Sequence, residues 1–276
     1  MINTRAVILA GGRGERVAPI SQTLPKALIP LHGKPMIAYQ LEQLQRLGFK
    51  EVFVLTGYLG ESIRTYCQTL NLEIKVICFE SDVNATPAER LINSSQIVGN
   101  HFLLIYCDNY ILEDNDILKV LQSQTEITFL VEPREKGNVL IEQNSHAKYY
   151  SGSRNKLYGY VELGNIKIDS NSFFQVLNST KDLQITLEKI SSELTCNSVI
   201  TSKGTWSISN LDRILNINQN RKIIMLDRDG ILLKKMPHRE YLTNFSDYMP
   251  IYENWEGLRD IGHLGFDFVI VTNQPG

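Results

Sequence analysis

Cysteine is scarce in this sequence, and long hydrophobic runs are absent. The four cysteines among 276 residues form no C-x-x-C pair and have no histidine at metal-binding distance, so we interpret them as reduced, mostly buried thiols and not as a disulfide scaffold or zinc site. They are Cys67, Cys78, Cys107 and Cys196. The longest apolar stretches, such as Phe102–Cys107, are far shorter than the roughly 18 residues of a membrane span. Because Met1–Arg5 also lacks the organisation of a signal peptide, the sequence predicts a cytoplasmic protein with no membrane partner.

An excess of either charge is missing as well. Lys and Arg number 28 against 30 Asp and Glu, so the formal net charge is −2. This balance leaves no positive field that would collect nucleic acid without sequence preference, and a small-molecule substrate is favoured. The length of 276 residues, with 43% hydrophobic and 21% charged residues, suits an ordinary folded chain of one to two domains.

Five short β-branched or apolar runs alternate with segments of helical character. They are Ala6–Ala10, Glu51–Thr56, Glu73–Phe79, Phe102–Tyr106 and Ile127–Glu132. Between the first two, Pro35–Leu47 carries apolar residues at helical spacing and ends before Gly48. This succession of strand, helix and strand predicts an α/β fold with a Rossmann-like, doubly wound, mostly parallel sheet.

The character of the chain changes twice after this region. Residues from about 134 to 205 contain polar turns between strand candidates, so we expect an inserted or appended layer that faces the substrate. The polar stretch Asn216–Arg221 then precedes a new apolar run that begins at Lys222. We therefore predict two domains, residues 1–218 and an incomplete second α/β domain over residues 219–276.

A glycine loop follows the first predicted strand. Gly11 and Gly12 let backbone N–H groups approach a polyphosphate where a Cβ atom would collide, although a tight turn without a ligand is the alternative. The spacing matches neither the dinucleotide fingerprint nor the Walker loop. Two more blocks follow at Leu24–Pro30 and Gly33–Met36. The ordered array L-A-G-G-x-G-x-R, P-K-x-L-x-P and G-K-P resembles the sugar-1-phosphate nucleotidyltransferase family.

The resemblance covers residues 5 to about 215 and implies transfer of a nucleotidyl group from an NTP to a sugar 1-phosphate, with release of pyrophosphate. By motif position, Arg16 would hold the triphosphate and Lys26 the sugar phosphate, as catalytic residues. The alternative is that both residues are solvated surface charges without a ligand. The resemblance also implies six nucleotide-binding residues, namely Ala10, Gly11, Gly12, Gly14, Glu80 and Thr86.

The resemblance further implies a Mg²⁺ cofactor. Asp108 follows the strand-like run that ends at Tyr106, where the family has a metal-binding Asp, and the alternative is that it caps a turn. Ser207 stands where the family has its second metal-binding Asp. Three alternatives follow from this replacement. The metal is held by Asp108 and the substrate phosphates, or Glu162 supplies the second carboxylate, or the reaction is slower than is usual for the family.

Two segments bear on the substrate. Ala85 replaces the usual glycine of the loop that borders the base and sugar. The sequence therefore leaves open which base is recognised. Glu162 and Gly164 lie at the position of the sugar-binding strand, although a strand-edge Glu that is simply solvated is the alternative.

A second motif lies after residue 221. Ile223–Leu232 contains an apolar strand followed by D-x-D-G, which resembles motif I of the haloacid dehalogenase superfamily of phosphatases. Two carboxylates at that spacing can divide the work, with Asp227 as the nucleophile and Asp229 as the acid, and both would bind Mg²⁺. Thr272 and Asn273 resemble the phosphate-binding motif II. The branch it resembles most contains heptose 1,7-bisphosphate and histidinol phosphatases.

These two resemblances lead to one expected function. A phosphatase that removes the distal phosphate of a sugar bisphosphate would produce the substrate of a nucleotidyltransferase, so we expect NDP-heptose synthesis for surface polysaccharide, with GTP favoured. A hexose 1-phosphate substrate and a non-catalytic NDP-sugar sensor are the alternatives, and a homo-oligomer is left open. Because the later phosphatase motifs are not encoded before Gly276, we expect a truncated second domain without phosphatase activity.

Overall fold

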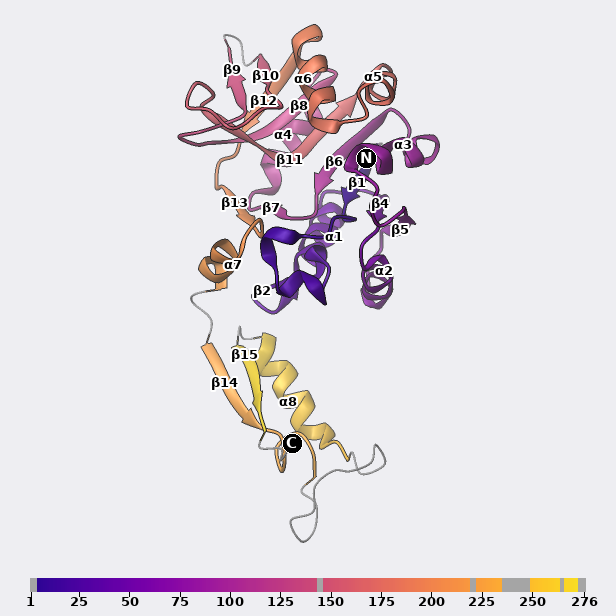
Figure 1. The fold of residues 1–276 in the computed structure, drawn as a ribbon. Coiled ribbons are helices and arrows are strands. Elements are labelled where there is room, and N and C mark those ends of the chain that lie inside the picture. The colour runs from indigo at the N-terminus through magenta and orange to yellow at the C-terminus, as the bar shows by residue number, and fades with distance from the viewer. Residues whose placement is uncertain (1–3, 143–145, 219–221, 235–248, 264–265, 273–276) are drawn as a thin grey trace. The chain divides into compact units, whose positions relative to one another are not determined.

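The computed structural model describes residues 4–142, 146–218, 222–234, 249–263 and 266–272 (Figure 1). The chain divides into two compact units, one of Met1–Ile29 and Pro35–Ile214 and the other of Pro30–Lys34 and Leu215–Gly276. The domain boundary after residue 218 stays a prediction. Among the described residues, no helix has both the length and the apolar character needed to cross a bilayer.

The first unit is built on a nine-stranded sheet that contains β1 (Arg5–Leu9) as an interior strand. Strand β4 (Glu51–Thr56) and strand β6 (His101–Tyr106) flank β1 in parallel, and β5 (Lys75–Glu80) lies parallel to β4 at the edge. The predicted parallel strands are therefore confirmed. Because all four run the same way, their carboxyl ends meet at one edge of the sheet.

The other half of the sheet is mixed. Strand β11 (Tyr160–Asp169) runs antiparallel to both β6 and β8 (Ile127–Pro133), and β12 (Cys196–Ile200) is parallel to β8. Short strands β9 (Val139–Ile141) and β10 (Ala147–Tyr149) complete it. The prediction of a separate layer over residues 134–205 is thus wrong for β11 and β12, which join the central sheet. The physical reason is that β11 is buried from Val161 to Ile168 although Glu162, Asn165 and Lys167 within it are polar, so its sequence does not have the continuous apolar run that is typical of a strand covered on both faces.

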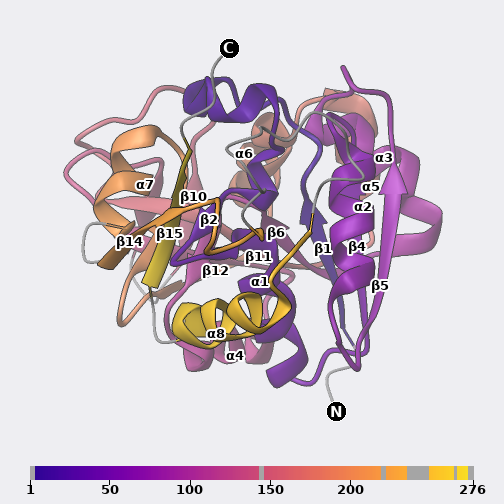
Figure 2. The same ribbon diagram turned by 90° about the horizontal axis from the view of Figure 1, so that it is seen from below.

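Helices cover both faces of the sheet. The predicted segment Pro35–Leu47 forms α1, and Ile37, Leu41 and Leu44 are fully or almost fully buried. The helices of this unit are α1 (Met36–Arg46), α2 (Gly60–Thr69), α3 (Pro87–Val98), α4 (Asp114–Gln122), α5 (Phe173–Thr180) and α6 (Leu183–Glu193). Helix α2 runs beside β4 and β5 (Figure 1, Figure 2).

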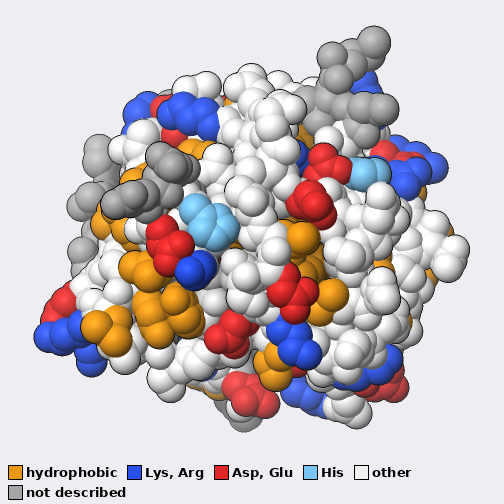
Figure 3. Space-filling view, turned by 90° about the horizontal axis from the view of Figure 1, so that it is seen from above, with side chains coloured by type: hydrophobic (Ala, Val, Ile, Leu, Met, Phe, Trp, Pro, Cys, Tyr) orange, Lys and Arg blue, Asp and Glu red, His pale blue; other side chains and the backbone are white. Residues whose placement is uncertain are grey.

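Two hydrophobic cores result from the alternation along the strands. Ala6 and Ile8 of β1 pack with residues of α1, α2 and α4, whereas Val7 packs with residues of α3, α5 and α6. Successive side chains of a strand point to opposite faces, so this division confirms the doubly wound α/β fold. Over the face shown in Figure 3, basic and acidic side chains are interspersed, as the balanced composition predicts.

Short elements connect these layers. The 3₁₀ helices η1 (Glu15–Val17), η2 (Ile20–Gln22) and η3 (Lys26–Leu28) follow β1, and β2 (Pro30–Leu31) pairs with β3 (Lys34–Pro35). Strand β7 (Asn109–Ile111) pairs antiparallel with β13 (Thr205–Ser207), and α7 (Leu211–Asn218) follows β13.

The second unit contains a parallel pair of strands. Strand β14 (Lys222–Asp227) lies beside β15 (Phe266–Val271), and helix α8 (Tyr252–His263) precedes β15 in the chain. Leu232 and Leu233 are buried within it, and the indole of Trp255 donates to the carbonyl oxygen of Leu232 at 3.1 Å.

Candidate functional site

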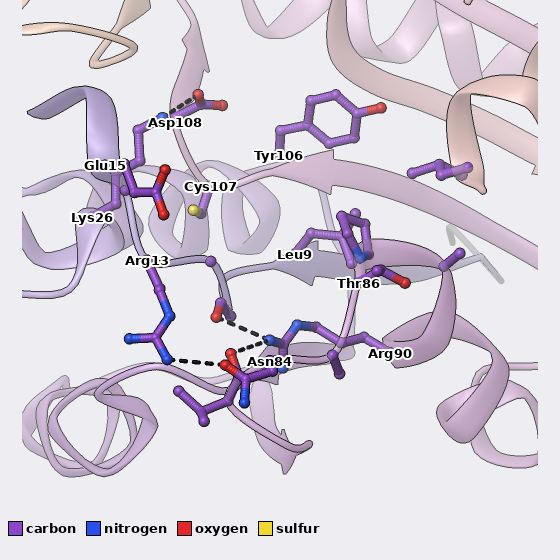
Figure 4. Close-up of a pocket in the computed structure, with 18 of the residues that line it drawn as sticks. Leu9, Arg13, Glu15, Lys26, Asn84, Thr86, Arg90, Tyr106, Cys107 and Asp108 are labelled. Carbon is purple, nitrogen blue, oxygen red and sulfur yellow. Dashed lines mark hydrogen bonds and ion pairs between the residues drawn. The ribbon is translucent and has the colours of Figure 1, made fainter. Parts of the chain in front are cut away.

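A cavity of about 860 Å³ opens in the first unit where β1 and β6 end (Figure 4). Its walls come from residues 11–16 of the glycine loop, from residues 83–88 before and within α3, from residues 106–108 after β6, and from residues 181–184 at the start of α6. The cavity thus lies at the carboxyl ends of parallel strands, where open α/β sheets bind their ligands.

The glycine loop forms one wall of the cavity, and its backbone requires glycine at one position. Gly14 has a φ of 66°, in the left-handed region, and begins the turn of η1. A Cβ atom built on Gly12 would meet nothing within 4 Å, so this part of the loop faces open space. The predicted nucleotide-binding residues Gly11, Gly12 and Gly14 all line the cavity.

Lys26 and Asp108 meet at one end of the cavity. The Nζ atom of Lys26 donates to Oδ2 of Asp108 at 2.6 Å, and their side chains are only 13% and 18% exposed. Asp108 lies two residues after the end of β6, and Lys26 begins η3. The alternative of a solvated surface charge is therefore wrong for Lys26, while its role at a phosphate stays a prediction.

Arg16 lines the same cavity with an exposed side chain, together with two residues that the sequence did not single out. Arg13 donates from Nη2 to Oδ1 of Asn84 at 3.0 Å and lies 5.3 Å from the ring centroid of Tyr58. Glu15 adds a carboxylate to the wall. Arg13 stood at the variable position of the glycine block, so the motif gave no reason to select it.

Thr86 lines the cavity as the N-cap of α3. Its hydroxyl accepts from the N–H of Glu89 at 3.2 Å, and the carboxylate of Glu89 accepts from the N–H of Thr86 at 2.7 Å. This capping box fixes the loop that carries Ala85 against the helix start. Ala10 and Glu80 do not line the cavity: Ala10 is buried behind it, and Glu80 is ion-paired with Arg64 at 2.7 Å.

Arg90 is a lining residue that sequence reasoning missed. Its side chain is 3% exposed, and burial lowers the pKa of its guanidinium from the usual value. It donates to the carbonyl oxygen of Thr56 at 2.7 Å. It also donates to the carbonyl oxygen of Gly11 at 3.0 Å (Figure 4). A single Arg within a helix carries no pattern that would predict this placement.

Glu162 and Gly164 lie on β11, at a register shift between Glu162 and Ile166. Glu162 is 8% exposed, so the alternative of a solvated strand-edge carboxylate is wrong. Burial raises its pKa to about 8, and the charge of Asp108 acts in the same direction. The N–H of Gly164 donates to the Glu162 carboxylate. Neither residue lines the cavity, and their place in sugar binding stays a prediction.

Two contacts connect β11 and α1 to the segment around Asp108. The side-chain amide of Asn109 donates to the carbonyl oxygen of Leu163 at 2.9 Å. The amide of Gln40, on α1, donates to the carbonyl oxygens of Tyr106 at 2.9 Å and Asn109 at 2.7 Å. The turn that presents Asp108 is thus fixed from both sides. Gln40 lies on the buried face of α1 and was not predicted.

Ser207 lies next to the turn that carries Asp108, and its place at the second metal-ligand position stays a prediction. It pairs with Asn109 across β7 and β13, and the next N–H, of Ile208, donates to the carbonyl oxygen of Asp108 at 2.9 Å. Among the described residues, no group of three or more His, Cys, Asp or Glu side chains could hold a metal ion. One carboxylate and one hydroxyl suit a Mg²⁺ ion that substrate phosphates also bind, and not a cage of protein ligands.

In the second unit, the predicted phosphatase residues lie at one end of the β14–β15 pair. Asp227 ends β14 opposite Val271, so Thr272 follows at the same end. The carboxylate of Asp229 accepts two hydrogen bonds at 3.0 Å from Arg228. Asn273 lies outside the described residues. The roles of these residues stay predictions.

Comparison with known proteins places the first unit in a family. Residues 5–170 match the family described as Nucleotidyl transferase. The chain is 27% identical over 173 residues to a bifunctional sugar-1-phosphate nucleotidylyltransferase/acetyltransferase of Sulfurisphaera tokodaii, covering 61% of this chain and 42% of that protein. It is 26% identical over 212 residues to a putative mannose-1-phosphate guanyltransferase of Sulfolobus acidocaldarius, covering 73% and 58%. The chain thus spans about half the length of these relatives.

Solved structures show the same fold. Apo UDP-glucose pyrophosphorylase has a TM-score of 0.66 and 14% identity, with 79% of this chain and 97% of that chain covered. HddC from Yersinia pseudotuberculosis has a TM-score of 0.62 and 17% identity, with 78% and 97% covered. The α/β nucleotidyltransferase fold is therefore shown. With 166 of its 276 residues matched, this chain belongs to the nucleotidyl transferase family.

Proposed function

We propose that the first unit transfers a nucleotidyl group from an NTP to a sugar 1-phosphate and releases pyrophosphate. The observation that carries this proposal is the meeting of Lys26 and Asp108 beside the glycine loop in one cavity. Three motifs that are separated in the sequence thereby come together at a single site. The activities for which the Sulfurisphaera and Sulfolobus relatives are named support the same reaction class.

The reaction needs alignment and charge neutralisation more than covalent catalysis by the protein. An oxygen of the sugar phosphate attacks the α-phosphorus, a new P–O bond forms, and the bond to the departing pyrophosphate breaks. In this proposal Arg16 holds the triphosphate, and Lys26 holds the attacking phosphate. Both would stabilise the charge that builds up on phosphate oxygens in the transition state.

The charges of the cavity suit an anionic substrate. Five basic side chains and three acidic side chains line it. The basic residues are Arg13, Arg16, Lys26, Arg90 and Lys181, and the acidic residues are Glu15, Asp108 and Asp182. A bound Mg²⁺ ion would neutralise phosphate charge further, as it generally does in this family, with Asp108 as its protein carboxylate and Ser207 as a neighbouring hydroxyl.

For the finer substrate we propose a heptose 1-phosphate with GTP. The support is the second unit, where Asp227, Asp229 and the residue after β15 share one strand end in the manner expected of a phosphatase motif. Such a phosphatase would remove the distal phosphate of a sugar bisphosphate and supply the acceptor. We also propose that residues 1–218 and 219–276 are the two functional domains.

The same experiment distinguishes two alternative functions. The Sulfolobus relative is named for mannose 1-phosphate, which favours a hexose acceptor. The neutral Ser207 favours a unit that binds an NDP-sugar without turnover.

The test is pyrophosphate release by the full chain with Mg²⁺, measured with GTP, ATP, CTP, UTP and dTTP against heptose, mannose and glucose 1-phosphates. We expect turnover that depends on both substrates and is lost in Lys26→Met. The matched control is Lys75→Met, whose lysine is 71% exposed at the edge of the sheet. Nucleotide binding without pyrophosphate release in any combination would instead favour the sensor.

A further inference from the structure

Arg90 connects three segments that line the nucleotide cavity. From α3, its guanidinium donates to the carbonyl oxygens of Thr56 at 2.7 Å, Gly11 at 3.0 Å and Val83 at 3.5 Å. These carbonyls belong to the end of β4, the glycine loop and the loop before α3. The side chain is therefore a single fixed point for three otherwise separate backbone segments.

The charge of this guanidinium is not paired. The three acceptors of its hydrogen bonds are neutral carbonyls, and no carboxylate among the described residues forms an ion pair with it. Asp82 and Glu89 act on it only through space. A buried charge without a counter-ion is costly, and a bound anion would lower that cost. Because Arg90 lines the cavity, an anion bound there could supply that compensation.

Glycines make room for the guanidinium on two sides. A Cβ atom on Gly11 would lie 2.4 Å from Cζ of Arg90, and one on Gly57 would lie 2.2 Å from Nη1. Any larger residue at either position would displace the side chain. The lack of a side chain at Gly11 therefore leaves room for the Arg90 guanidinium, whereas Gly12 faces open space.

We propose that Arg90 is a positioning residue for the nucleotide: it fixes the glycine loop and the loop before α3, and its buried charge attracts the triphosphate. The proposal rests on the proposed function. The carbonyl of Gly11 accepts from Arg90 and also from the N–H of Tyr58 at 3.0 Å. Since the C=O and N–H of one trans peptide point in opposite directions, this anchoring directs the N–H of Gly12 away from the guanidinium. That N–H becomes a fixed donor in the loop that faces the ligand.

The experiment compares Arg90→Met and Arg90→Lys with the wild-type chain. Binding of GTP, ATP, CTP, UTP and dTTP with Mg²⁺ is measured by calorimetry, and KM and kcat are measured wherever turnover occurs. The matched control is Lys167→Met. Lys167 is a buried cation that also donates to two carbonyls, those of Ser123 at 2.5 Å and Thr125 at 3.2 Å. It differs from Arg90 in that it does not line the cavity and lies 3.6 Å from the carboxylate of Asp169.

We expect Arg90→Met to weaken binding of the preferred NTP at least tenfold and to raise its KM by a similar factor, with the KM for sugar phosphate changed less than threefold. Arg90→Lys should recover part of the loss, and Lys167→Met should bind within threefold of wild type. If Arg90→Met does not fold, Gly57→Ala replaces it. That variant keeps the charge but displaces the guanidinium, and we expect at least a fivefold loss of affinity.

Other outcomes overturn the proposal. Binding within threefold of wild type in Arg90→Met, or in Gly57→Ala, would overturn the positioning role and leave the proposed function standing. An equal loss of nucleotide affinity in Lys167→Met would show that removal of any buried cation weakens binding through a general loss of structure, which would also overturn the positioning role. If the wild-type chain binds none of the five nucleotides, the proposed function fails, and the role of Arg90 fails with it.

Discussion

The ammonium of Lys26 and the carboxylate of Asp108 form an ion pair of 2.6 Å, although 82 positions separate them in the sequence. Each group is the main candidate of its motif, one for a phosphate and the other for a metal ion. The two opposite charges neutralise one another. Under the proposed function Lys26 would turn to the sugar phosphate and Asp108 to the metal ion, so we expect the two binding events to be coupled.

Removal of either predicted phosphate-binding charge should slow the reaction strongly. We expect Lys26→Ala and Arg16→Ala each to reduce the rate of nucleotidyl transfer at least 10²-fold, because a lost charge-assisted contact to phosphate costs roughly 2–4 kcal/mol in a desolvated site. The measurement is steady-state pyrophosphate release, with circular dichroism as the check on folding. Rates within threefold of wild type would show that these side chains do not hold the reacting phosphates.

Asp108→Asn should weaken the effect of Mg²⁺ on nucleotide binding. It removes the carboxylate that lies two residues after the end of β6 and leaves Lys26 without its ion-pair partner. We expect the gain in NTP affinity on addition of Mg²⁺ to fall at least tenfold, as measured by calorimetry with Mg²⁺ or with EDTA. Glu142→Gln, which removes an exposed carboxylate paired with Lys148, is the control. An unchanged Mg²⁺ effect would place the metal elsewhere.

Ser207→Asp should restore a second carboxylate to the same place. Ser207 is 7% exposed and pairs with Asn109, so an Asp there would lie near Asp108. Without metal, the two like charges should lower the melting temperature, and Mg²⁺ should recover it and bind more tightly than to wild type. The measurement is a thermal-shift titration with MgCl₂. A melting temperature that does not respond to Mg²⁺ would show that this position faces no metal.

The sequence predicted those parts of the site that follow strands in contiguous motifs. The glycine loop after β1, Lys26 and Asp108 were found because each stands in a block of fixed spacing, and the structure brings all three to one cavity. Arg90 and Gln40 were missed, since a lone polar residue within a helix normally faces solvent. Residues 181–184 reach the cavity only through the packing of α5 and α6, which no local pattern encodes.

The mixed half of the sheet shows a second limit of local patterns. The segment of β11 was expected in a separate layer because polar turns separate the strand candidates of residues 134–205, yet β11 pairs with β6 over Asn165–Asp169. Its burial comes from neighbours on both sides of the sheet, which are distant in sequence. The same burial explains the unexpected environment of Glu162.

Glu162 should make the stability of the protein depend on pH in a defined window. Its pKa is raised from 4.5 to about 8, chiefly by burial, so between these values the folded state holds a proton that the unfolded state has lost. Stability that is present below pH 4.5 is therefore lost as the pH rises toward 8, with a slope of at most about 1.4 kcal/mol per pH unit. Glu162→Gln cannot ionise and should lack this slope. Urea unfolding of both proteins between pH 5 and pH 8.5 tests the prediction: the free energy of unfolding of the variant should rise relative to wild type with increasing pH, and parallel curves would show that Glu162 titrates normally.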